Sequence, residues 1–108
     1  MSKRFRLAEA MIAPDGAVED AGRGRFLVET ESGAQLVIDG PRHRYRREPA
    51  PSSEALAGDG RWAHVHGHSP IRVGPRLTMY LSDLAVYVSS TVVAVWRIVG
   101  AIDDDHRA

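Results

Sequence analysis

Residues 76–100 have the sequence RLTMYLSDLAVYVSSTVVAVWRIVG and decide the fold, because no other long segment is both apolar and rich in β-branched and aromatic residues. At the start of this stretch apolar residues recur at every second position, so Leu77, Met79 and Leu81 point one way and their neighbours point the other. This period is typical of a half-buried β-strand. The stretch therefore predicts extended chain.

A tight hairpin is predicted where Ser82 and Asp83 interrupt the apolar pattern. The returning strand is apolar on both faces, as expected of a central strand, since Leu84, Val86 and Val88 alternate with Ala85, Tyr87 and Ser89. The alternation continues to residue 99, with one face made of Val92, Ala94, Trp96 and Ile98 and the other of Thr91, Val93, Val95, Arg97 and Val99.

A membrane helix is the rival interpretation, because residues 84–102 approach the roughly 20 that a bilayer crossing requires. The polar residues at 89–91 and Arg97 argue against it, the arginine costing roughly 2.5–3.5 kcal/mol near a helix centre. The many valines also favour a strand over a helix. We therefore expect strands and no membrane association.

Composition indicates one ordinary domain, since the chain has 108 residues of which 44% are hydrophobic. Fourteen Lys plus Arg balance fourteen Asp plus Glu, so no net charge attracts the protein to nucleic acid or anionic lipid. There is no Cys, and the apolar run near the N-terminus is short and broken by Glu9. We expect a cytoplasmic protein.

Other strands are predicted upstream of this stretch. Residues 25–39 form the clearest hairpin, turning at Gly33, and residues 3–13 fit either a helix or a first strand, of which we choose the strand. We expect residues 1–102 to be a single β domain, residues 48–60 a long internal loop, and residues 103–108 a disordered acidic tail.

The expected fold is mainly β, with six or seven antiparallel strands in a small barrel or barrel-like sandwich. OB-like and SH3-like barrels are the analogues by size. The core is expected to contain the inward residues of each strand, namely Phe26, Val28, Leu36, Ile38, Leu77, Met79, Leu81, Val86, Val88, Val92 and Trp96.

A basic cluster, RHRYRR, occupies residues 42–47. In an extended chain Arg42, Arg44 and Arg46 lie on one side, opposite His43, Tyr45 and Arg47, an arrangement that can grip phosphates and stack a base of single-stranded nucleic acid. The alternative is a solvated edge strand whose charges prevent pairing with another chain. We favour the edge strand.

A row of histidines follows at His64, His66 and His68. Imidazoles two residues apart on a strand project from one face about 7 Å apart, so two of them can bind one divalent metal ion. A third ligand would come from elsewhere, and His43 and Asp59 are candidates. The alternative is an exposed polar face without metal.

The spacing Gly58-x5-His64-x-His66 resembles the first half of the cupin metal motif over nine residues. The resemblance implies a metal-centred active site inside a jelly-roll barrel. Pro70 and Ile71 stand where cupins have a Glu, and the second cupin block has no counterpart here.

The function expected first is a non-catalytic interaction module that binds a protein partner or itself, without a cofactor. A barrel interior hides only one side of the last strand, so Val93, Val95 and Val99 need a cover. The alternatives are metal binding by the histidine row and nucleic-acid binding by the basic cluster. No catalytic motif requires an enzyme.

Overall fold

The computed structural model describes residues 6–11, 24–51, 53–82 and 85–99, and this part of the chain is mainly antiparallel β with no α-helix. The predicted mainly β class is therefore confirmed. The elements are β1 (Arg6–Met11), β2 (Arg25–Thr30), β3 (Gln35–Asp39), the short 3₁₀ helix η2 (Gly40–Arg42), β4 (Arg44–Glu48), β5 (Trp62–His64), β6 (Gly67–His68), β7 (Arg76–Tyr80) and β8 (Val86–Val99).

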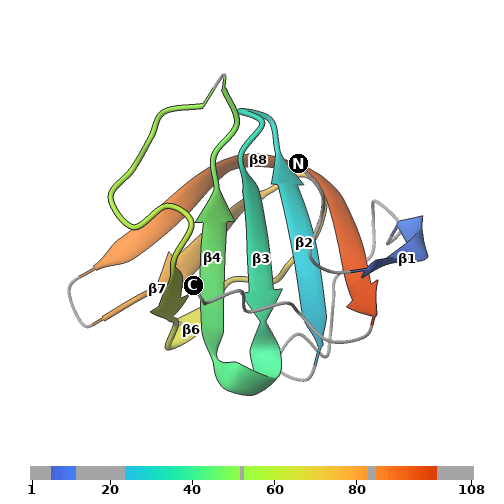
Figure 1. Ribbon diagram of the computed structural model, residues 1–108, viewed down its shortest axis with the longest axis horizontal. Helices are drawn as coiled ribbons and strands as arrows, with labels where there is room; N and C mark the ends of the chain where they lie inside the picture. Colours follow the sequence, from blue (N-terminus) through green and yellow to red (C-terminus); the bar gives the residue numbers. More distant parts are fainter. Residues whose placement is uncertain (1–5, 12–23, 52, 83–84, 100–108) are drawn as a thin grey trace.

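The strands form one sheet in the order β5-β4-β3-β2-β8-β7-β6, with β1 also paired to β8. Figure 1 shows β8 curving from the β7 side of the molecule to the β1 side. Its first half pairs with β7, and its second half pairs with β2 and β1. In the described part of the chain no ladder joins β6 back to β5, so the sheet is open and a closed barrel is not confirmed.

A β-bulge at Val93 changes the pattern expected for β8. Glu29 pairs with Ala94 but Thr30 pairs with Val92, which leaves Val93 as an extra residue. Val92 and Val95 consequently enter the same core cluster, although strict alternation assigned them to opposite faces. The predicted face assignment is wrong from the bulge onward because the alternation slips by one residue.

The main core lies on one face of the sheet and contains seven of the predicted residues. It consists of Phe26, Val28, Leu36, Ile38, Leu77, Met79 and Val92, together with Val65, Ile71 and Val95, and Leu81 packs against it partly buried. The prediction was wrong for Val86 and Val88, which are 53% and 49% exposed. They lie on the outer face of the β7–β8 pair, where no described element covers them.

A second, smaller cluster lies on the opposite face of the sheet. Leu27, Val37 and Ile98 are buried there, with Trp62 and Trp96 packed against them. Trp96 was expected in the main core, but after the bulge it faces the other way and remains partly buried. The sheet is thus apolar on both faces where β2, β3 and β8 meet.

Turn chemistry fixes the β2–β3 hairpin as the sequence predicted. Gly33 has φ of 95°, in the left-handed region that favours glycine. The Gly33 N–H donates to the Thr30 carbonyl at 2.9 Å, and the Thr30 N–H donates to the Ala34 carbonyl at 3.1 Å. The hairpin is thereby closed by local bonds.

The segment predicted as a first strand, 3–13, contains β1, so the strand interpretation holds for Arg6–Met11. The expected tail, 103–108, lies outside the described residues. No helix in the described part of the chain is both long and apolar enough for a bilayer crossing.

Candidate functional site

The first half of β8 has an open edge. One edge of this half pairs with β7, where Met79 is the register partner of Tyr87. The opposite edge, on the β2 side, is the open one. On the β2 side, β2 ends at Thr30, and the last contacts are the Glu31 N–H donating to the Thr91 carbonyl at 2.8 Å and the Ser32 N–H donating to Ser90 Oγ at 3.2 Å. From there back to residue 86 no described strand pairs with this edge.

Large apolar side chains cover the outer face of the same β7–β8 hairpin. Tyr80 is 46% exposed and stands opposite Val86, and Val88 stands opposite Thr78. The three exposed residues Tyr80, Val86 and Val88 are called the hairpin patch below. Residues 85–92 carry no charged side chain, whereas exposed strand edges usually do.

The predicted interface valines are placed differently from one another. Val93 is 47% exposed at the bulge, as an interface residue would be. Val95 is fully buried in the main core and is not accessible to a partner, because the bulge turns it inward. The side chain of Val99 lies outside the described part of the structure.

The basic cluster is largely paired with acids. Arg44 Nε lies 3.0 Å from Asp39 Oδ2, Arg46 pairs with Glu48, and Arg42 lies in η2. Arg46 is also buried, so its charge is not presented to solvent. Arg44 and Arg46 lie on Trp62 whereas Tyr45 and Arg47 line a hollow on the other face, so the predicted alternation holds for residues 44–47 but not for Arg42. The favoured edge-strand interpretation is wrong, because β4 pairs with β3 on one side and with β5 on the other. Nucleic-acid binding by residues 42–47 stays a prediction.

Trp62 of β5 lies beneath two of these arginines. The Arg44 guanidinium carbon is 3.9 Å from the centroid of the Trp62 ring, and that of Arg46 is 4.7 Å from it. Arg46 and Trp62 are direct partners in the β4–β5 register, which brings the side chains together. The arginines therefore cover the second apolar cluster as cation–π partners.

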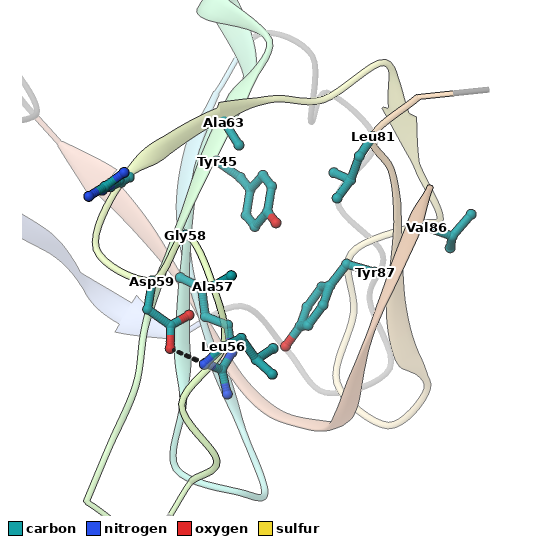
Figure 2. A pocket seen from close by; sticks show the side chains of 11 residues that line it. Tyr45, Leu56, Ala57, Gly58, Asp59, Ala63, Leu81, Val86 and Tyr87 are labelled. Atoms are coloured by element: carbon teal, nitrogen blue, oxygen red, sulfur yellow. Dashed lines mark hydrogen bonds and ion pairs between the residues drawn. The ribbon is translucent and has the colours of Figure 1, made fainter. Parts of the chain in front are cut away.

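Arg47 and Tyr45 lie on the inner face and belong to a polar group that sequence reasoning missed. Arg47 Nη1 donates to Asp59 Oδ2 at 2.6 Å, and Nη2 donates to the Glu54 carbonyl at 2.9 Å. The Tyr45 ring is stacked near Tyr87, with centroids 6.3 Å apart and planes 20° apart. Figure 2 shows both rings projecting into the hollow above this ion pair.

The surroundings shift three pKa values in this group. Burial raises the pKa of Tyr45, and the nearby Tyr87 and Asp59 add to the rise. Burial alone would lower the pKa of Arg47, but its hydrogen bonds to Asp59 and Tyr87 and their charges outweigh this effect. Burial alone would raise the pKa of Asp59, but its hydrogen bond to Arg47 and the Arg47 charge outweigh this effect. The pKa of Arg47 is therefore raised and that of Asp59 lowered, so both groups are charged at neutral pH.

The histidine row does not lie on one continuous strand. β5 ends at His64, and His66 precedes β6, yet the rings of His64 and His66 meet edge to face with centroids 4.7 Å apart. His68 turns to its own backbone, with Nδ1 2.7 Å from the Ser69 carbonyl. His43 takes a left-handed backbone conformation with φ of 53°. The centroid of its ring lies 6.5 Å from the centroid of the His64 ring.

His43, His66 and His68 also line a hollow of about 200 Å³ beside Val65. Within the described ranges no group of three or more His, Cys, Asp or Glu side chains is arranged to hold a metal ion. Metal binding by His64, His66 and His68 stays a prediction. Asp59, named as a further candidate ligand, is engaged by Arg47 instead.

Comparisons with protein-family models, with curated proteins and with solved structures found no match for this chain.

Proposed function

We propose that the protein is a non-catalytic interaction module that binds a protein partner through the β7–β8 hairpin, the partner to test first being a second copy of the chain. One observation carries the proposal. The hairpin patch of Tyr80, Val86 and Val88 is about half exposed and lies beside the open, uncharged edge of β8. Exposed apolar side chains that gather beside an unpaired strand edge are features through which sheets associate.

Two contributions favour association at this position. An added strand would satisfy the backbone groups of the open β8 edge, the mode of β-augmentation. Complete burial of a valine side chain contributes roughly 1.5–3 kcal/mol. Because each of these valines is already half buried, covering the rest would contribute about 1 kcal/mol. Because the chain has no net charge, two copies do not repel one another over long range.

The proposal includes a barrel-like arrangement and a cytoplasmic location. The residues between β5 and β6 support the first, since the Val65 N–H donates to the His43 carbonyl at 2.8 Å and the His66 N–H donates to the Tyr80 carbonyl at 2.8 Å. The segment thus passes from the β4 side of the sheet to the β7 side within two residues. The absence of Cys suits a reducing compartment.

The test is the mass in solution, measured by size-exclusion chromatography with light scattering across a concentration series. We expect wild-type protein to associate and Val88→Lys to remain monomeric. Val93→Lys separates the hairpin patch from the contact predicted at Val93: this residue is exposed to a similar extent but lies at the bulge, beyond the open edge, and because the proposal narrows the contact to the hairpin we expect Val93→Lys to associate as wild type does. Wild-type protein that is monomeric at millimolar concentration, with rapidly exchanging amides at 86 and 88, would contradict self-association.

A further inference from the structure

Three histidine rings from separate elements gather where the chain passes from β5 to β6. His64 ends β5, His66 precedes β6, and His43 lies between η2 and β4, and all three residues are exposed. The rings of His64 and His66 have centroids 4.7 Å apart, and the His43 ring is 6.5 Å from that of His64. On a regular strand, side chains two residues apart are about 7 Å apart at their bases. The fold therefore brings these rings closer together than the strand period does.

Backbone hydrogen bonds hold the three histidines in place. The Val65 N–H, which lies between His64 and His66, donates to the His43 carbonyl at 2.8 Å. The His66 N–H donates to the Tyr80 carbonyl of β7 at 2.8 Å. The backbone of each histidine is thus fixed relative to the others, while the exposed side chains are free to rotate.

The backbone of His43 is strained. Among the described residues it is the one non-glycine residue with positive φ, at 53°. A left-handed conformation costs a residue with a Cβ on the order of 1 kcal/mol, whereas glycine adopts it freely. Strained residues of this kind cluster at ligand sites. The side chain that position 43 gains in exchange for the strain is an imidazole beside His64.

The spacing of the rings suits one metal ion. With metal–nitrogen bonds of roughly 2.0–2.1 Å, each ring centroid lies about 3.2 Å from the ion, so two bound rings have centroids about 4.5–5.2 Å apart for angles from square-planar to tetrahedral. The 4.7 Å between His64 and His66 falls within this range. The 6.5 Å between His43 and His64 is longer by about 1 Å, which rotation of the exposed His43 side chain closes.

The donor set selects the kind of ion. Imidazole nitrogens suit Cu²⁺, Ni²⁺ and Zn²⁺, whereas Mg²⁺ and Ca²⁺ require oxygen ligands. Among divalent first-row ions Cu²⁺ binds such nitrogens most tightly. Arg44, the register partner of His64, is balanced by Asp39 at 3.0 Å, so its charge opposes a bound cation only weakly. The hollow lined by His43 and His66 leaves room for the waters that complete the coordination.

We propose that His43, His64 and His66 bind one divalent transition-metal ion, with Cu²⁺ bound most tightly. His64 and His66 are the first two ligands, and His43 becomes the third when its side chain rotates. His43 thus takes the place that the sequence gave to His68, whose Nδ1 lies 2.7 Å from the Ser69 carbonyl. All three ligands come from one chain, so the site does not depend on the proposed protein contact.

Metal titration of the full-length protein, prepared without a tag, tests the site. Isothermal titration calorimetry with CuCl₂, ZnCl₂ and MgCl₂ measures affinity, and electron paramagnetic resonance of the Cu²⁺ complex counts the nitrogen ligands. We expect one Cu²⁺ per chain with three nitrogens, Zn²⁺ bound about 10-fold or more weakly, and no Mg²⁺ binding.

Substitutions assign the ligands. His64→Ala is expected to weaken Cu²⁺ binding about 10-fold or more. His43→Gly removes the ring but accepts the left-handed backbone, and it is expected to reduce the nitrogen count from three to two. His68→Ala and His106→Ala, which remove the histidines outside the proposed set, are the matched controls and should keep both affinity and nitrogen count. Circular dichroism melts check that each variant folds.

The results separate the site from nonspecific binding. The proposal is overturned if Cu²⁺ binding does not saturate at one ion per chain, if Mg²⁺ binds as tightly as Cu²⁺, or if either control loses as much affinity as His64→Ala. Two nitrogens in both wild type and His43→Gly would overturn the assignment of His43.

Discussion

The Arg47–Asp59 ion pair ties the loop before β5 to β4, and replacing its acid tests that role. Asp59 Oδ2 accepts from Arg47 Nη1 at 2.6 Å and from the Leu56 N–H at 2.9 Å, so one oxygen connects the strand and the loop. Asp59→Asn keeps the shape of the side chain but removes the charge. Arg47 then remains buried without its counter-ion.

The expected cost follows from this geometry. Breaking a fully buried pair costs about 3–5 kcal/mol, and a hydrogen bond to a charged group is worth about 1.5–3 kcal/mol. Because Asp59 is 14% exposed and the amide retains an acceptor, we expect Asp59→Asn to lower the free energy of unfolding by about 2–3 kcal/mol. For a chain of this size that corresponds to a fall in Tm of about 8–12 °C.

The assay is urea unfolding followed by tryptophan fluorescence between pH 7 and pH 2.5. The pKa of Asp59 is lower in the folded state than in the unfolded state, so its contribution is present above pH 4 and is lost as the pH falls through the folded value. The difference between wild type and Asp59→Asn should therefore shrink in acid. Glu54→Gln is the control, since this exposed residue uses only its carbonyl in the contact.

Two results would refute this reasoning. Equal stability of wild type and Asp59→Asn at pH 7 would mean that the pair contributes nothing. A difference that is constant down to pH 2.5 would mean that the charge of Asp59 is not its source.

Four further substitutions test the core, the bulge and the hairpin turn. Val95→Asp places a charge in the main core and should prevent folding, whereas Val93→Asp should change stability by less than about 0.5 kcal/mol; similar circular dichroism melts for the two would contradict the bulge. Met79→Ala should cost about 2–5 kcal/mol in urea unfolding, because Met79 is fully buried, and a smaller loss would mean that the core collapses onto the space. Gly33→Ala should cost about 1 kcal/mol in the same assay through its positive φ, and an unchanged midpoint would argue against the left-handed turn.

The candidate contacts of the basic cluster and of the histidines were only partly predictable. The alternation of residues 44–47 across β4 follows from the strand period. Asp59 becomes the partner of Arg47 only because the loop folds back, with the Gly60 N–H donating to the Arg47 carbonyl at 2.8 Å. His43 approaches His64 only because β5 pairs with β4 and places Arg44 opposite His64.

The sequence by itself determined where extended chain and tight turns occur. Period-two patterns mark β2, β3 and β7, and Gly33 marks a turn, because strand period and turn conformation depend on neighbouring residues only. Which valines of β8 are buried was decided by the tertiary structure. Val95 is buried because β2 pairs with β8 around the bulge at Val93, and Val86 is exposed because the β7–β8 register shifts between Arg76 and Thr78, so that Tyr87 packs against the core instead; both depend on how β8 pairs with its neighbouring strands.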